Sequence, residues 1–299
     1  MTVQIQTGAK ARIAPAGLAF LAITSIGWGL NWPIVKHILT EWPPLSARGL
    51  TGIVGAALLA TLALMRGQSL AVPRDQWPRL LLSAFLNVTT WMTLMGLALL
   101  WLPASEAAVI AYTMPVWASL LAWLVLGERM SITRILALVM AFAGIAALMG
   151  GNGIDASMEK LPGIVMVLVG AFAFALGTVA AKRLPVAMPL IASSAWQIGI
   201  GCVPVALAGL LFEHPRLEAL STVGWALMAY MTVIQFCIAY VCWFAALERL
   251  PASVAAIGTM AVPVIGVVAS AFALHEPLGI GQIAALLFTL AGVALATRS

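Results

Sequence analysis

The stretches LPASEAAVIAYTMPVW (Leu102–Trp117) and LPASVAAIGTMAVPVI (Leu250–Ile265) show that the chain carries nearly the same segment twice. A shift of 148 residues aligns 102–146 with 250–294 without a gap, and 17 of those 45 positions are identical. Abundant alanine and leucine inflate such a count, but matched prolines, glutamates and glycines do not follow from composition. These pairs include Pro103/Pro251, Pro115/Pro263, Glu128/Glu276 and Gly144/Gly292. The sequence therefore contains two related halves.

The composition points to a lipid environment. Of the 299 residues, 63% are hydrophobic and 8% are charged, against about 25% charged residues in soluble domains. Apolar runs of about 18 to 24 residues recur along the chain, and each is long enough to cross a bilayer as a helix. They are unbroken, whereas the strands of a membrane barrel alternate polar and apolar residues. The predicted spans are 17–38, 45–66, 80–100, 104–126, 133–150, 162–182, 189–212, 222–247, 252–273 and 279–297.

Each half holds five of these spans. Because five is odd, the second half must enter the membrane upside down relative to the first, which is the plan of transporters whose substrate site lies between two inverted repeats. We therefore expect an all-α polytopic membrane protein with ten transmembrane helices in two inverted five-helix repeats around a central cavity. The predicted organisation is a cytoplasmic segment 1–16, a first repeat 17–150, a non-cytoplasmic linker 151–161 and a second repeat 162–299.

The distribution of positive charge predicts the orientation. With the N-terminus inside, eleven of the 15 lysines and arginines fall in cytoplasmic segments and four on the other side, as the positive-inside rule requires. An even number of spans also returns the C-terminus to the cytoplasm. The first apolar run contains Trp28 and Trp32 and lacks a small-residue cleavage pattern, so it is interpreted as a retained helix and not as an export signal. The chain is expected in the cytoplasmic (inner) membrane.

Five motifs carry a resemblance to a known family. They are GWGLNWPIVK (Gly27–Lys36), PPLSARGL (Pro43–Leu50), the LPASEAAVIAYTMPVW stretch, LGERM (Leu126–Met130) and LHEP (Leu274–Pro277). In this order they resemble the signatures of the drug/metabolite transporter superfamily, in its ten-helix EamA-type branch, and within it the YddG-type exporters of aromatic amino acids. The resemblance implies cytoplasmic termini, two inverted five-helix bundles, and export of small metabolites or amino acids.

Amides and tryptophans inside the spans are the main candidates for a binding site. Asn87 and Gln235 occupy equivalent positions in the two halves, and each is either a ligand contact or an interhelical hydrogen-bonding group. Tryptophans deep in their spans either line a pocket or fill the bundle. Trp28 shares a face with Asn31, whereas Trp32 is expected to point elsewhere. The candidate substrate-binding residues are Trp28, Asn31, Asn87, Trp91, Glu106, Tyr112, Trp196, Gln197, Gln235 and Trp243.

Glu106 stands out because the equivalent residue in the second half is Val254. A carboxylate in a first helical turn is stabilised by the helix dipole, or it pairs with a substrate ammonium, a proton or Lys36. Lys36, Arg48 and Lys182 lie near span ends, where long side chains are expected to reach water.

Pro115 and Pro263 are candidate kinks or hinges, because a proline inside a span removes a backbone hydrogen bond. Simple bundle curvature is the alternative role for the pair. Glu128 and Glu276 are expected to cap the helices that follow them or to anchor the membrane interface.

The favoured function is a secondary transporter that exports small metabolites, aromatic amino acids foremost, by alternating access. Several tryptophans and amides with few charges suit the stacking of a ring and hydrogen bonding of a polar head. The alternatives are export of another small metabolite or drug in the same superfamily, or an integral membrane enzyme. His37, His214 and His275 all lie at span ends without a nucleophile set. The expected partners are a small-molecule substrate and the bilayer; no cofactor, metal, nucleic acid or ATPase is expected.

Overall fold

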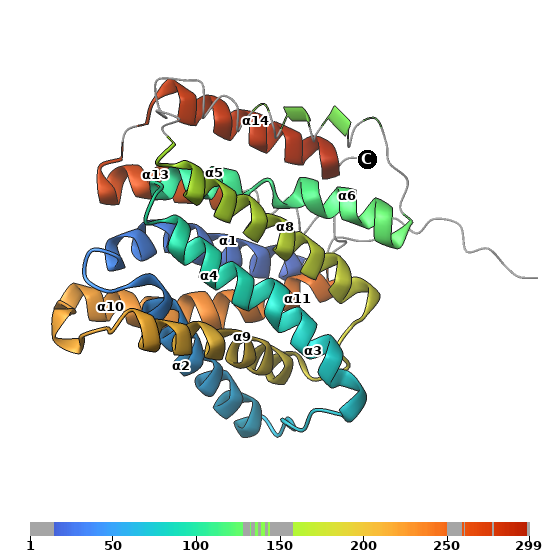
Figure 1. The fold of residues 1–299 in the computed structure, drawn as a ribbon. Coiled ribbons are helices and arrows are strands. Elements are labelled where there is room, and N and C mark those ends of the chain that lie inside the picture. Colours follow the sequence, from blue (N-terminus) through green and yellow to red (C-terminus); the bar gives the residue numbers. More distant parts are fainter. Residues whose placement is uncertain are drawn as a thin grey trace, which may run out of the picture.

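The fold is seen in a computed structural model that describes residues 15–127, 158–249, 261–276 and 278–297, together with Thr259 and isolated positions between 132 and 143. Every regular element in these residues is helical (Figure 1). The elements are α1 (Pro15–Ile38), α2 (Pro44–Met65), η1 (Arg74–Gln76), α3 (Trp77–Ala84), η2 (Phe85–Thr89), α4 (Thr90–Ala98), α5 (Ala104–Ala111), α6 (Met114–Leu126), α8 (Leu161–Arg183), α9 (Leu190–Phe212), η3 (Leu217–Ala219), α10 (Thr222–Tyr230), η4 (Met231–Ala239), α11 (Tyr240–Arg249), α13 (Ala261–Leu274) and α14 (Ile280–Thr297).

Seven helical segments in the described ranges are long and apolar enough to cross a bilayer. They run over 15–38, 44–65, 74–98, 104–126, 161–183, 190–212 and 222–246, close to seven of the predicted spans. Helix α13 overlaps the ninth predicted span and ends one residue after it, and helix α14 falls within the tenth. The fifth, 133–150, lies almost wholly outside the described residues, as do segment 1–14 and linker residues 151–157. The chain is thus an integral, all-helical membrane protein.

Three of the long segments are not regular α-helices along their whole length. Segment 74–98 contains the π-helical segment η2, and segment 222–246 contains the π-helical segment η4. The shift of 148 residues that relates the two halves places η2 inside η4, with Asn87 opposite Gln235. π-Helical turns concentrate at functional sites. Segment 104–126 is interrupted at Tyr112–Thr113, between α5 and α6.

Helix packing repeats itself when the halves are exchanged. Helix α2 packs along its equivalent α9; α1 packs on α13, as α8 does on α6; and α1 packs on α11, as α8 does on α4. Glycines allow the central pair to approach closely. A Cβ at Gly49 would overlap the backbone of Ala206, and one at Gly209 would lie 2.5 Å from Ser46 N. Small residues are the usual means by which membrane helices approach each other.

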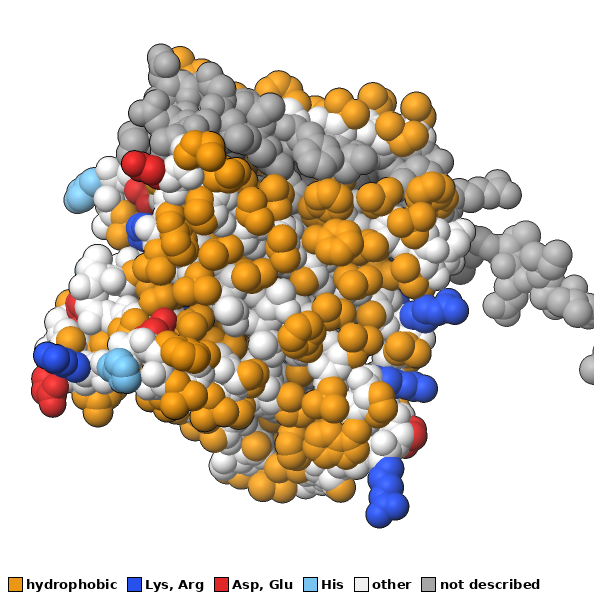
Figure 2. Space-filling model, in the orientation of Figure 1, with side chains coloured by type: hydrophobic (Ala, Val, Ile, Leu, Met, Phe, Trp, Pro, Cys, Tyr) orange, Lys and Arg blue, Asp and Glu red, His pale blue; other side chains and the backbone are white. Residues whose placement is uncertain are grey.

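Figure 2 shows a broad band of apolar side chains between two ends that carry the charges. One end, here the carboxylate end, consists of the loops 39–43, 99–103, 158–160, 213–221 and 275–279 with the adjoining helix termini. The other, here the basic end, consists of 66–76 and 184–189 with the adjoining termini. Six of the eight described acidic residues lie at the carboxylate end, and five of the ten described lysines and arginines lie at the basic end.

Candidate functional site

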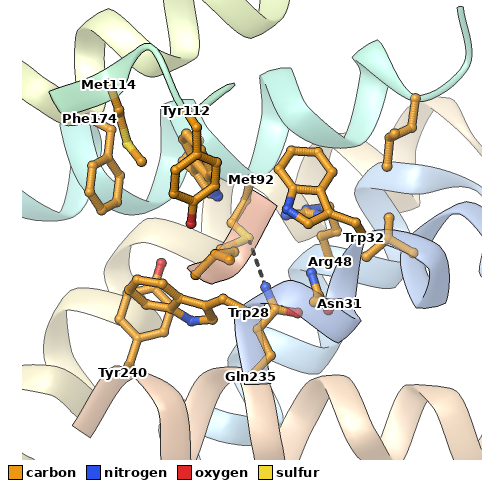
Figure 3. Close-up of a pocket in the computed structure, with 14 residues that line it drawn as sticks. Trp28, Asn31, Trp32, Arg48, Met92, Tyr112, Met114, Phe174, Gln235 and Tyr240 are labelled. Carbon is orange, nitrogen blue, oxygen red and sulfur yellow. Dashed lines mark hydrogen bonds between the residues drawn. The ribbon is translucent and has the colours of Figure 1, made fainter. Parts of the chain in front are cut away.

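A central cavity lies among α1, α2, α4, η4, α8 and the break between α5 and α6 (Figure 3). It encloses about 550 Å³ of space free of protein atoms, part of it open to solvent. Trp28, Asn31, Trp91, Tyr112 and Gln235, five of the predicted binding residues, line it. Its mixture of aromatic rings with a few polar groups is typical of the lining of a small-molecule site.

Three buried polar groups in this cavity have atoms without a hydrogen-bond partner in the described residues. They are Asn31 Oδ1, Gln235 Oε1 and Arg48 Nε. Gln235 Nε2 reaches only Met92 Sδ, at 4.0 Å. Figure 3 shows Asn31, Arg48 and Gln235 on one side of the cavity, while Tyr112, Phe174 and Tyr240 lie on the other. Since a buried polar atom without a partner costs about 1–3 kcal/mol, these groups are suited to a ligand.

Aromatic rings separate this cavity from a larger vestibule. Trp28 contacts Tyr240 at a ring-centroid distance of 5.3 Å, and Trp91 contacts Phe174 at 5.1 Å. Tyr240 and Phe174 line both spaces. The vestibule encloses about 1540 Å³, open solvent included, and reaches Arg79 and Lys182 at the basic end. The two spaces therefore adjoin each other at these rings, with the vestibule on the side of the basic end.

The vestibule holds three further predicted residues: Asn87, Gln197 and Trp243. Asn87 Nδ2 donates to Ser83 O and Ser83 Oγ at 3.1 and 3.2 Å, and Ser83 Oγ donates to Gln197 Oε1 at 2.7 Å. Asn87 also packs so closely on Gly177 that a Cβ there would overlap its carboxamide. Asn87 is thus fixed by the protein itself, unlike Gln235.

The carboxylate end is closed above the central cavity. Lys36 Nζ at the end of α1 donates to the carbonyl oxygens of Leu99 and Leu102, at 2.5 and 3.0 Å. Lys160 Nζ donates to both carboxylate oxygens of Glu106, at 3.1 and 3.3 Å. The Glu106 side chain is 2% exposed. The partner of Glu106 is therefore Lys160 from the start of α8, not Lys36.

Two glutamates at this end cap helices that are distant in sequence. Glu276 accepts hydrogen bonds from Ala104 N, Ser105 N and Ser105 Oγ at the start of α5. Glu213 accepts the equivalent three from Leu45 N, Ser46 N and Ser46 Oγ at the start of α2. Carboxylates satisfy the free N–H groups of a helix start. The predicted cap at Glu276 exists, but it is on α5 of the first half and not on the helix that follows.

A third glutamate joins two loops at the carboxylate end. Glu41 accepts from Ser221 N and Ser221 Oγ at the start of α10. These hydrogen bonds to Ser221 lower the pKa of Glu41 below its usual value of 4.5. The adjacent Trp42 Nε1 donates to Arg216 O at 2.7 Å. Segments from both halves are therefore tied together across this end.

Two predicted binding residues lie outside both cavities. Glu106 is engaged by Lys160, as described above. Trp196 Nε1 donates to Leu70 O at 2.8 Å, and its ring meets Trp77 edge-on at 5.5 Å. Trp196 therefore holds the loop after α2 against α9, near the basic end.

Of the two predicted hinge prolines, Pro115 is seen at a helix break. Pro115 lies in the first turn of α6, directly after the interruption at Tyr112–Thr113. Because proline has no N–H, it cannot donate to the carbonyl of residue 111. Pro263 is buried near the start of the described part of α13. Residues 250–258 before it lie outside the described residues.

Four aromatic or charged residues of the cavity were not among the predicted binding residues. Trp32 lines the cavity beside Asn31, contrary to the expected orientation. Tyr240 had no sequence signal, because the π-helical turn of η4 changes which residues share a face with Gln235. Phe174 lies on the regular helix α8, and nothing in the sequence singled it out. Arg48 was expected to reach water, yet it is 3% exposed and lines the cavity. Its position one turn inside an apolar span was the available signal.

The described residues hold no group of three or more His, Cys, Asp or Glu side chains placed to bind a metal. The polar chemistry that the described site offers is thus one guanidinium, two amide oxygens and the hydroxyls of Tyr112 and Tyr240.

Comparison with known proteins gives consistent matches over nearly the whole chain. The model of the EamA-like transporter family matches twice, over residues 15–150 and 161–298. The chain is 32% identical over 283 residues to the uncharacterized transporter YvbV of Bacillus subtilis (strain 168), covering 93% of this chain and 89% of the relative. It is 24% identical to a protein of Salmonella typhimurium (strain LT2) named as a probable amino-acid metabolite efflux pump, with 92% of each chain covered.

A solved crystal structure has the same fold. It superposes with a TM-score of 0.72 and covers 95% of this chain and 98% of its own, at 21% sequence identity. At this identity the similarity concerns the fold alone.

Proposed function

This chain belongs to the EamA-like transporter family, and from that premise we propose that it is a secondary transporter that exports aromatic amino acids by alternating access. The observation that carries the proposal is the central cavity, where aromatic rings face amide oxygens that lack partners. A flat side chain would stack on the rings, and the polar head would bond to the amides. The name of the Salmonella relative supports amino-acid metabolites as the substrate class.

The proposed architecture has ten spans in two inverted halves. It is supported by the two family matches, by the reciprocal packing of equivalent helices and by π-helical segments at equivalent positions. Alternating access requires the halves to rock about a central site. The π-helical segments and the break before Pro115 are the proposed points of bending.

The proposed orientation places the basic end in the cytoplasm of a cell whose inner membrane holds the protein. The vestibule then opens to the cytoplasm, and the carboxylate end is the closed outer gate. A substrate would enter between Arg79 and Lys182, pass the rings of Phe174 and Tyr240, and bind in the central cavity. Opening of the carboxylate end would then release it outside.

The test is flux in liposomes. Purified protein should exchange labelled tryptophan or phenylalanine with saturation and without ATP. Trp91→Ala, which removes a cavity ring, should lower this flux, whereas Trp101→Ala, at a residue 39% exposed just beyond α4, should leave it intact. No saturable movement of any aromatic amino acid would refute the proposed substrate. Equal flux in the two variants would refute the site.

A further inference from the structure

We propose that Arg48 is the receptor for a carboxylate on the transported molecule, which restricts the substrates to metabolites that carry one. This inference rests on the proposed transport through the central cavity. It names a residue and a chemical group that the aromatic lining alone does not specify.

Burial of the Arg48 guanidinium costs free energy as long as no ligand pairs with it. The residue is 3% exposed, one turn into α2, and its Nε has no partner among the described residues. Helix α4 accommodates its stem at Gly96, where a Cβ would lie 2.9 Å from Arg48 Cδ. Ionisable side chains within membrane segments are rare and usually line a polar path.

The nearby acidic residues are engaged elsewhere. Glu213 caps α2, Glu276 caps α5, and Glu106 pairs with Lys160. No described carboxylate lies within ion-pair distance of Arg48. A guanidinium left without an acid in a buried cavity favours an anion, and its planar set of donors matches the two oxygens of a carboxylate.

The remaining polar atoms fit the other part of an amino acid. Asn31 Oδ1 and Gln235 Oε1 are acceptors without donors, so both can receive an ammonium group. In Figure 3 they lie on the Arg48 side of the cavity, opposite Tyr112, Phe174 and Tyr240. A zwitterion with its carboxylate on Arg48 and its ammonium on the amides would direct its side chain toward the rings. A phosphate ester would require more than one cation here.

The experiment compares ligands in pairs that differ only in the carboxylate. Binding to the full-length protein in detergent is measured by calorimetry for tryptophan and tryptamine, phenylalanine and phenethylamine, and leucine and isoamylamine, with phenyl phosphate as the competing anion. The wild type should bind the carboxylate member of a pair about 10- to 150-fold more tightly, the factor expected of a hydrogen bond to a charged group. Arg48→Gln should abolish that ratio, and Arg48→Lys should retain part of it.

The matched control is Arg66→Gln, an exposed arginine at the other end of the same helix, which should keep the full ratio. Since the readout is a ratio within one variant, a general loss of stability does not imitate it; if Arg48→Gln fails to fold, Arg48→Lys provides the comparison. Tighter binding of phenyl phosphate, equal binding within every pair, or no binding of any carboxylate would overturn the proposal. An Arg48-dependent preference seen only with leucine would refute the aromatic substrate and support the carboxylate receptor.

Discussion

The two ends of the molecule differ in how their helices are joined. At the carboxylate end, carboxylates and lysines connect segments far apart in sequence, and the central cavity is sealed. Among the described residues of the basic end, Arg79 donates to Pro185 O, Ala187 N donates to Gln76 Oε1 and Trp196 Nε1 donates to Leu70 O, so neutral acceptors join the segments there. The wide vestibule lies on that side. Buried apolar side chains such as Ile38, Leu99 and Leu102 also pack at the carboxylate end, so polar bonds and apolar packing close it together.

Among the variants that test this difference between the ends, Lys160→Met should cause the largest loss of stability. It leaves the buried Glu106 carboxylate without its cation, which should cost about 3–5 kcal/mol of unfolding free energy. Arg79→Met, at a partly exposed arginine of the basic end, should cost less than about 1 kcal/mol. Denaturant unfolding in micelles measures both. The double variant Lys160→Met/Glu106→Gln should recover part of the loss; a full additive loss would mean that the pair is not coupled.

Glu276→Ala should have the next largest effect. It removes the acceptor of three donors at the start of α5, and loss of a helix cap costs about 0.5–2 kcal/mol. Thermal unfolding provides the measurement, with Glu218→Ala, an exposed glutamate of the same end, as the control. If both variants melt at the same temperature, the cap does not hold this end closed.

Cysteine labelling tests the two ends directly. Thr178→Cys in the vestibule should react with a bulky, water-soluble maleimide much faster than Val35→Cys, which is 1% exposed and lies on the sealed side of the central cavity. Labelling of the parent protein, with its three native cysteines, is subtracted. Adding Glu276→Ala should raise the Val35→Cys rate and leave that of Thr178→Cys unchanged. Comparable rates at both sites would remove the contrast between the ends.

The smallest effect concerns pH. Since hydrogen bonds from Ser221 lower the pKa of Glu41, its contribution to stability is present above the ordinary value of 4.5 and is lost as pH falls through the lowered value. Glu41→Gln should therefore reduce stability at neutral pH and flatten its decline below pH 4.5. Melting curves between pH 7 and pH 3 measure this. An unchanged acid limb would show that Ser221 is held by other contacts.

The helical class and most spans could be predicted from the sequence, because a bilayer requires long apolar runs and the runs are uninterrupted. The interior geometry could not. Sequence periodicity assumes 3.6 residues per turn, and this assumption fails at η2 and η4. Tyr240, directly after η4, therefore lies in the cavity without a sequence signal. Trp28 and Asn31, on the regular helix α1, were placed together correctly. Trp32 was misplaced although it lies on the same helix, where a residue four positions after Trp28 shares its face.

The amides show how equivalence in sequence differs from equivalence in structure. Asn87 and Gln235 occupy matching positions, yet Asn87 is hydrogen-bonded to Ser83 and packed on Gly177, while Gln235 Oε1 has no described partner. The shift of 146 residues that aligns Lys36 with Lys182 also places Asn31 opposite Gly177. One half thus has an amide beside Gln235 where the other has a glycine beside Asn87. The two amides therefore differ because neighbouring helices place different residues beside them.

The cap on α5 also bears on how the chain is made. Glu276 lies 172 residues after Ala104, so at about 5–20 residues per second the ribosome needs about 10–30 s to supply it once the helix start has been synthesised. Throughout that interval the start of α5 lacks the hydrogen bonds to Glu276 that are present in the finished protein. A fragment truncated before residue 276 would lack this cap on α5, however well its own helices inserted.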